Sequence, residues 1–166
     1  MSKRHTRLTQ PRKNRGFTMV ELMFTVMILA ILSAAALPSF RSFIVGQRIK
    51  SASFDLMSTL IMARSEAIKR NTNVGVTPTG GSWQNGWTVA VGGTTLSQQS
   101  ALGNGVAAAC YSSGTVAACT ALTYQNNGRL SGTAPSIQLS STDASIDTRC
   151  IGIDLSGRPN SKKGNC

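Results

Sequence analysis

An apolar run near the N-terminus, interrupted by a single acid, constrains this chain more than any other feature. Residues 17–37 contain Glu21 and no other charged side chain. At about 1.5 Å of rise per residue, they make a helix of roughly 30 Å, which is the thickness of the hydrocarbon core of a bilayer. We therefore predict a transmembrane helix over residues 17–38. A carboxylate at that depth is costly, so Glu21 either stays at the start of the span or has a partner.

The tail before this run is strongly basic. The chain has a formal net charge of +11, and residues 1–16 hold six bases and no acid. Lysine and arginine beside an apolar segment stay on the cytoplasmic side of the membrane. The tail is therefore interpreted as a topology signal rather than as a nucleic-acid-binding arm, and residues 39–166 are expected on the opposite side of the membrane.

A helical pattern continues beyond Pro38. This proline removes one backbone hydrogen bond, so it should kink the helix without ending it. Apolar residues then recur at intervals of three and four, which is typical of an amphipathic helix with one buried stripe. The helix is expected to end near Arg70. The stripe consists of Ile49, Ala52, Leu56, Leu60, Ala63 and Ala67.

After Asn71 the sequence changes to short β-like pieces separated by turn residues. We predict an α+β fold, in which the long helix packs on a small antiparallel sheet. The polar, glycine-rich segment from Gly92 to Gly105 is expected to be a loop, and Asn126–Arg129 a tight hairpin turn. Trp83 and Trp87 are expected in the core. The predicted strands lie in "NVGVTP", "GWTVAVGG", "ALTYQNNG", "SIQLSS" and "RCIGIDLSG".

Four cysteines lie in this C-terminal part, at positions 110, 119, 150 and 166. An even number in a small region beyond a membrane signal indicates disulfides in an oxidising compartment. Three pairings are possible. We favour Cys110–Cys119 and Cys150–Cys166 because both close short loops, and buried free thiols remain the alternative. No C-x-x-C pair is present, which argues against a zinc or thioredoxin-type site.

The sequence gives little support for an enzyme. His5 is the only histidine, and it lies in the segment that we expect to be removed. Without a histidine, no Ser/His/Asp arrangement and no metal-ligand cluster can be assembled from the remaining acids. We therefore predict no catalytic residues, no metal and no cofactor. A structural or interaction protein is the favoured class.

The position of Gly16 suggests how the basic tail is removed. An ordinary secretory signal places the small-residue cleavage site after the apolar run. Here the small residue comes before it. Cleavage between Gly16 and Phe17 would remove residues 1–16 as a leader and keep the apolar helix on the mature protein, with Glu21 as its fifth residue.

The stretch "RGFTMVEL" resembles the class III signal of type IV pilins and type II secretion pseudopilins. The resemblance implies that a prepilin peptidase cuts after Gly16 and methylates the new N-terminus at Phe17. It also assigns Glu21 and Pro38 to the assembly helix. The segments "LMSTLIMARSEAIKRNTNVGV", "GWTVAV" and "CIGIDLSGRPNSKKGNC" are similar to the GspH/FimT subgroup of minor pilins and pseudopilins.

The resemblance further implies a location and partners. The chain would span the bacterial inner membrane once, with a pilin-like domain over residues 39–166 in the periplasm. It would then enter a pilus or pseudopilus filament, at or near the tip. The implied partners are the prepilin peptidase, other major and minor pilins or pseudopilins, and the inner-membrane assembly platform. Whether the filament is a type IV pilus or a secretion pseudopilus stays open.

Cleavage would also give Glu21 a partner. The cut creates an α-amine at Phe17, and in a packed filament Glu21 of one subunit can meet the amine of a neighbour. A subunit in the wrong register would leave both charges unpaired in an apolar environment, at a cost of several kcal/mol. The alternative is that Glu21 lies at the membrane interface and its side chain extends to water.

DNA uptake is a second possible function. Some FimT-type pilins carry a glycine–arginine–x–arginine pattern that binds DNA. Gly157 and Arg158 match its first half, but Asn160 stands where the second arginine would be. The lysines that follow could replace its charge for phosphate contacts, but not its bidentate geometry. A solvated basic turn closed by a disulfide is the alternative. The candidate DNA-binding residues are Arg149, Arg158, Lys162 and Lys163.

Overall fold

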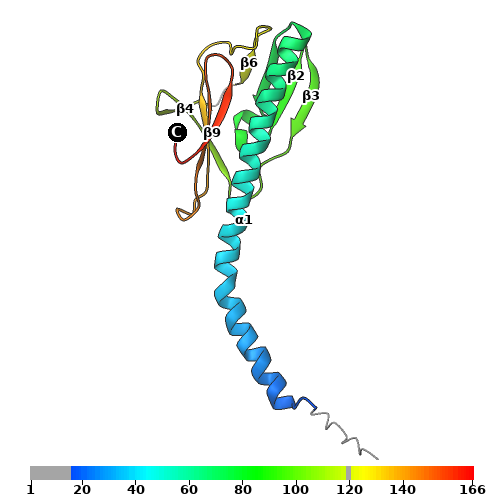
Figure 1. Ribbon diagram of the computed structural model, residues 1–166, viewed down its shortest axis with the longest axis vertical. Coiled ribbons are helices and arrows are strands. Elements are labelled where there is room, and N and C mark those ends of the chain that lie inside the picture. The colour runs from blue at the N-terminus through cyan, green and yellow to red at the C-terminus, as the bar shows by residue number, and fades with distance from the viewer. Residues whose placement is uncertain (1–15, 119–120) are drawn as a thin grey trace, which may run out of the picture. The chain divides into compact units, whose positions relative to one another are not determined.

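The computed structural model describes residues 16–118 and 121–166. The chain divides into two compact units, Met1–Pro38 and Ser39–Cys166. Helix α1, Met19–Arg70, includes residues of both units (Figure 1). The predictions that the helix continues past Pro38 and ends near Arg70 are therefore confirmed.

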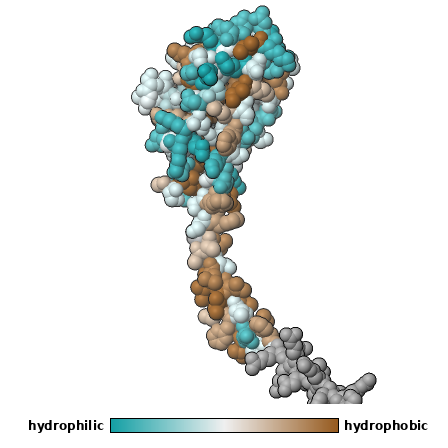
Figure 2. Space-filling view, in the orientation of Figure 1, coloured by the Kyte–Doolittle hydropathy of each residue, from teal (hydrophilic) through white to brown (hydrophobic). Residues whose placement is uncertain are grey.

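The α1 residues of the first unit are apolar and exposed. By length and composition α1 is a candidate membrane span, and none of its most apolar window is buried. Figure 2 shows this segment as a hydrophobic surface. Large side chains such as Met23, Phe24 and Leu29 are more than half exposed. An apolar surface of this kind requires lipid or another protein around it.

The α1 residues of the second unit are amphipathic, as the sequence predicts. All six residues of the predicted stripe are at most 4 % exposed. Phe54 and Ile61, which lie between stripe residues in the sequence, are 65 % and 52 % exposed. The 3.6-residue period therefore gave the correct buried face of this helix.

The first sheet contains the strands that directly follow the helix. Its order is β3-β2-β1-β6, and its neighbours are antiparallel. Two short 3₁₀ turns, η1 (Thr79–Gly81) and η2 (Trp83–Asn85), connect β1 to β2. The strands are β1 (Val74–Pro78), β2 (Trp87–Val91), β3 (Thr94–Gln99) and β6 (Leu122–Tyr124).

The second sheet is also antiparallel and contains the C-terminus. Its order is β5-β4-β7-β8-β9, so that β9 forms one edge of it (Figure 1). The strands are β4 (Ala107–Ser112), β5 (Thr115–Ala117), β7 (Ser136–Ser140), β8 (Arg149–Ile153) and β9 (Pro159–Lys163).

One hydrophobic core joins the helix to both sheets. The buried stripe of α1 shares a cluster with Val76 and Val89 of the first sheet and with Ile137 and Ile151 of the second. Trp83 and Trp87 are each 1 % exposed within it, which confirms their prediction as core residues. Burial of the α1 stripe against strands establishes the predicted α+β, pilin-like architecture.

Two expectations about this domain need correction. The strands of the described residues form two sheets where we expected one. The segment from Gly92 to Gly105 is also not all loop, because it contains β3. Gly92 and Gly93 adopt φ values of 52° and 84°, as a two-residue hairpin turn requires, and β3 pairs with β2 along its length. The sequence did not indicate β3 because the side chains of this strand are mostly polar. An edge strand is stabilised by backbone pairing even when few of its side chains are buried.

The hairpin turn predicted at Asn126–Arg129 is present. The N–H of Gln125 donates to the Arg129 carbonyl at 2.8 Å, and the N–H of Gly128 donates to the Gln125 carbonyl at 2.8 Å. Gly128 has a φ of 77° and lies against α1, where a Cβ atom would come within 2.7 Å of Ile68. The positive φ favours glycine at this position, whereas the Ile68 side chain could move to admit a Cβ atom.

Candidate functional site

The N-terminal site lies at the start of the apolar helix. Gly16, Phe17 and Thr18 precede α1, and all three residues are exposed. The side-chain oxygen of Thr18 accepts a hydrogen bond from the Glu21 backbone N–H at 3.2 Å. Thr18 therefore caps the helix, and Glu21 places a negative charge in its first turn, where the helix dipole favours it.

The carboxylate of Glu21 has no cationic partner among the described residues. The side chain is exposed, as are the apolar residues around it. The helix cap gives Glu21 a local role that the sequence interpretation missed, although a threonine three residues before a glutamate is a known signal for a helix start. This role leaves the carboxylate free to meet a charge on another chain.

The C-terminal site begins in the turn between β8 and β9. One carboxylate oxygen of Asp154 accepts hydrogen bonds from the Arg158 backbone N–H at 2.9 Å and from the Ser156 hydroxyl at 2.6 Å. These two hydrogen bonds hold the pKa of Asp154 below its usual value, and the bond from Ser156 is the larger cause. Gly157 has a φ of 79°, and a Cβ there would lie 2.1 Å from the Gly128 carbonyl oxygen. Asp154 and Gly157 thus fix the backbone that presents Arg158.

Strand β9 distributes its side chains over two faces of the sheet. Ser161 pairs with Ile151 on the face toward α1, and its hydroxyl lies 3.0 Å from that of Ser53 on the helix. Lys162 pairs with Cys150 on the opposite face. Because strand side chains alternate, Lys163 returns to the helix side. The two neighbouring lysines therefore point in opposite directions.

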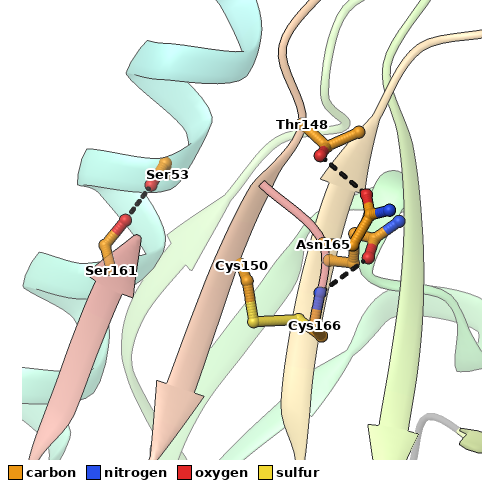
Figure 3. The surroundings of a disulfide bond; sticks show 7 residues. Ser53, Thr148, Cys150, Ser161, Asn165 and Cys166 are labelled. Atoms are coloured by element: carbon orange, nitrogen blue, oxygen red, sulfur yellow. Dashed lines mark hydrogen bonds between the residues drawn. A yellow bond between two sulfur atoms is a disulfide. The ribbon is translucent and has the colours of Figure 1, made fainter. Parts of the chain in front are cut away.

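A disulfide joins Cys150 to Cys166, as predicted, with their Cα atoms 5.1 Å apart (Figure 3). Hydrogen bonds hold the same segment: the N–H of Cys166 donates to the Gln138 side-chain oxygen at 2.9 Å, and the Thr148 hydroxyl donates to Asn165 at 2.9 Å. The C-terminus is therefore fixed against β7 and β8.

The second predicted disulfide joins Cys110 to Cys119, and only Cys110 belongs to the described residues. Cys110 lies on β4, is buried, and is not a free thiol. Its predicted partner, Cys119, lies outside the described residues. The pairing Cys110–Cys119 therefore remains a prediction.

The candidate basic residues do not form one patch. Arg149 and Lys163 are register partners at one end of β8 and β9. Lys163 forms a salt bridge of 2.8 Å with Asp147. Arg158 lies five residues before Lys163, which is about 17 Å along a strand. The single basic surface suggested by their closeness in sequence is thus divided between two ends of the sheet.

Two clefts border these separated residues, and helix α1 adds a cation to each. Arg158 lines a cleft of about 270 Å³ together with Arg64 and Ile61 of α1. Arg149 lines a cleft of about 320 Å³ that also includes Lys50 of α1. Sequence reasoning missed both helical cations, because they lie about 100 residues from the strands that they meet and only the tertiary fold brings them there.

The structure offers no arrangement typical of a metal enzyme in its described part. No group of three or more His, Cys, Asp and Glu side chains among those residues comes together to hold a metal ion. Acids that have partners serve local structure, as exposed Asp154 does in its turn and half-buried Glu66 does in an ion pair with Arg70. The features that remain as candidates for function are the exposed apolar surface of α1, the start of that helix at Thr18 and Glu21, and the two clefts that contain cations.

An apolar helix that continues into an amphipathic segment packed on antiparallel sheets defines a pilin-like protein. Models of protein families agree. Residues 52–157, well over half of the chain, match the family described as type II transport protein GspH. Residues 11–37 match the prokaryotic N-terminal methylation motif. The chain belongs to the GspH family of minor pilins and pseudopilins, whose members are structural subunits and not enzymes.

Solved structures share the fold. The type IV minor pilin FimU of Pseudomonas aeruginosa is 21 % identical with a TM-score of 0.61, covering 70 % of this chain and 89 % of FimU. The minor pseudopilin EpsH of the Vibrio cholerae type 2 secretion system is 13 % identical with a TM-score of 0.53, covering 69 % of this chain and 96 % of EpsH. No curated protein sequence matches the chain. Of these two neighbours, FimU is a type IV minor pilin and EpsH is a minor pseudopilin of a type 2 secretion system.

Proposed function

We propose that this chain is a minor pilin or pseudopilin that is cut after Gly16, anchored in the inner membrane by residues 17–38, and then incorporated into a filament at or near its tip. One observation carries the proposal. No residue in the most apolar window of α1 is buried, and this part of the helix lies within residues 11–37, which match the methylation motif. A helix of this kind can be covered by lipid before assembly and by other helices afterwards.

The proposed partners are the proteins that process the membrane-anchored chain and move it into the filament. The prepilin peptidase removes residues 1–16 and methylates Phe17. The assembly platform then transfers the subunit from the membrane to other pilins or pseudopilins, with residues 39–166 on the periplasmic side. Cleavage is tested with Gly16→Val, which should leave the chain at its full length in membranes. A mature-sized product from this variant would overturn the proposed cleavage site.

Glu21 is proposed to pair with the Phe17 α-amine of a neighbouring subunit. Its carboxylate is exposed and has no cationic partner among the described residues, which supports this role. Glu21→Ala should insert in the membrane normally but enter filaments less. Thr18→Ala serves as the control, since it removes the helix cap and leaves the carboxylate. Equal incorporation of Glu21→Ala and wild type would contradict the pairing.

The type of filament can be decided genetically. A strain that lacks this gene should lose twitching if the chain serves a type IV pilus, or exoprotein release if it serves a secretion pseudopilus. The two phenotypes are distinct readouts of the two machines. Complementation with the wild-type gene and with Gly16→Val would tie the phenotype to the processed protein.

Capture of DNA through the C-terminal segment is a second candidate function. It is supported by the exposure of Arg158 and Lys162, whose backbone is fixed by the Asp154 turn and by the Cys150–Cys166 disulfide. Arg158 lies in the turn just before β9 and Lys162 lies near the far end of that strand, and this separation suits spaced phosphate contacts better than bidentate recognition of one group. The binding would be sequence-independent and sensitive to salt.

The test for DNA capture is salt-dependent binding of duplex DNA by the detergent-solubilised chain. Changing Arg158, Lys162 and Lys163 to alanine should reduce the affinity and the slope of its salt dependence. Arg70→Ala is a control, because Arg70 is held by Glu66 at the end of α1. No binding at low salt, or unchanged binding by the triple variant, would remove this candidate.

A further inference from the structure

A cleft of about 320 Å³ lies within the Ser39–Cys166 unit. It separates the first α1 residues of this unit from the segment that leads into β8. Helix α1 forms one wall, and the residues that lead into β8 form the other. No part of this cleft involves the first unit. Its lining consists of Ser42, Phe43, Gly46, Gln47, Lys50, Ser145, Ile146, Asp147 and Arg149.

The cleft is cationic. Lys50 and Arg149 line it, and within the described residues neither has a carboxylate at ion-pair distance. Among the described lining residues Asp147 is the only acid, and it is engaged by Lys163 at 2.8 Å. Asp143 lies nearby in sequence, but its carboxylate accepts hydrogen bonds from Ser145. Two cations are therefore available to an anion.

Apolar side chains stand beside these charges. Phe43 is 61 % exposed, although it belongs to the helix that forms the core. Ile146 is half-buried on the facing wall and packs against the core cluster. A ligand that suits the cleft therefore has an anionic group with an apolar portion directly beside that group. Phospholipids combine a phosphate with acyl chains, and aromatic side chains favour the boundary between the two.

The sequence places the first lining residues of this cleft close to the end of the proposed membrane span. Phe43 follows Leu37, the last residue of the apolar run, by six positions. A chain anchored through residues 17–38 therefore carries Phe43 next to the bilayer surface by covalent connection alone. We propose that this cleft binds the phosphate headgroup of an anionic phospholipid, with Lys50 and Arg149 as its cationic ligands. The inference rests on the membrane anchoring given under the proposed function.

The expected strength is modest. A cation near an anionic membrane surface gains roughly fivefold in affinity, so two give about 25-fold over a neutral lipid. Such a contact would orient the domain on the membrane before assembly. It would also dissociate when the subunit is withdrawn from the bilayer, because no covalent or metal bond is involved.

The experiment uses the full-length chain reconstituted at one copy per lipid nanodisc. Discs contain phosphatidylcholine alone or with about one third phosphatidylglycerol, and amide hydrogen exchange is followed in residues 39–50 and 141–149. We expect exchange in these segments to slow at least threefold with phosphatidylglycerol. Lys50→Gln should lose most of this protection while leaving β8 unchanged. Lys162→Gln, which removes a cation from the opposite sheet face, should retain it.

Each other outcome contradicts the inference in its own way. Equal exchange in both discs, or equal loss with Lys50→Gln and Lys162→Gln, would overturn it. Protection by free inorganic phosphate in phosphatidylcholine discs would assign the site to a soluble anion. Protection that arises only with several copies per disc would assign it to a second subunit. A chain that fails to enter discs would contradict the anchoring, and therefore the proposed function itself.

Discussion

The hydroxyl groups of Ser53 and Ser161 lie 3.0 Å apart and join the buried face of helix α1 to the edge strand β9 (Figure 3). Ser53 is 2 % exposed and is the polar member of an otherwise apolar helix face, whereas Ser161 is exposed. The contact fixes the strand that presents the C-terminal lysines. It is a side-chain link between segments more than 100 residues apart in the sequence.

Ser161→Ala should destabilise the domain more than Ser53→Ala does. The first change leaves the Ser53 hydroxyl buried without its partner, at a cost of about 1–3 kcal/mol. The second leaves the Ser161 hydroxyl in reach of water, so the loss should be about 1 kcal/mol or less. Urea unfolding of the detergent-solubilised variants measures both. The opposite order would contradict the assigned burial.

Leu60→Ala should lower the free energy of unfolding by about 2–5 kcal/mol, because Leu60 is fully buried in the core. Ile61→Ala is the matched control: the next residue is 52 % exposed, and its truncation should cost less than about 1 kcal/mol. The two variants remove similar apolar volume from adjacent positions. Comparable losses would show that the buried stripe is assigned to the wrong helix face.

Removal of the Cys150–Cys166 disulfide should destabilise the domain by about 3 kcal/mol, since the bond closes a loop across 16 residues of sequence. The variant with both cysteines changed to alanine tests this in denaturant, under conditions that leave Cys110 unreduced. Reductant should lower the unfolding midpoint of the wild type more than that of this variant. Identical midpoints for variant and wild type would contradict a structural role for the bond.

Gly157→Ala should be more destabilising than Gly164→Ala. Both glycines have positive φ, so alanine introduces backbone strain of about 1 kcal/mol or more at either position. A Cβ at Gly157 would additionally lie 2.1 Å from the Gly128 carbonyl oxygen, whereas Gly164 has no atom within 4 Å of that position. Thermal unfolding separates the two costs. Equal effects would indicate that the two turns do not pack as described.

The parts of the fold that the sequence predicts well are those where one periodicity decides the structure. The apolar run gave the exposed helix, and the three-to-four spacing from Ile49 to Ala67 gave its buried stripe. Strands with buried aliphatic residues, such as β8, were also predicted. The residues of the core can thus be predicted from local patterns, because buried positions are occupied mainly by apolar residues.

The parts that escaped prediction depend on pairing or on tertiary contact. Strand β3 has mostly polar side chains and is a strand because β2 lies beside it. The placement of Arg149 and Arg158 in two separate clefts depends on the tertiary fold, which brings Lys50 and Arg64 of the helix to them. No local pattern carries that information, since the participating residues meet only after the sheets have formed.

The central claim is that this chain becomes a filament subunit whose N-terminus is made by cleavage after Gly16. Mass spectrometry of filaments sheared or purified from the producing bacterium tests it most directly. We expect a chain in the filament fraction whose first residue is N-methylated Phe17. A chain that retains residues 1–16, or a processed chain found in membranes and absent from filaments, would contradict it.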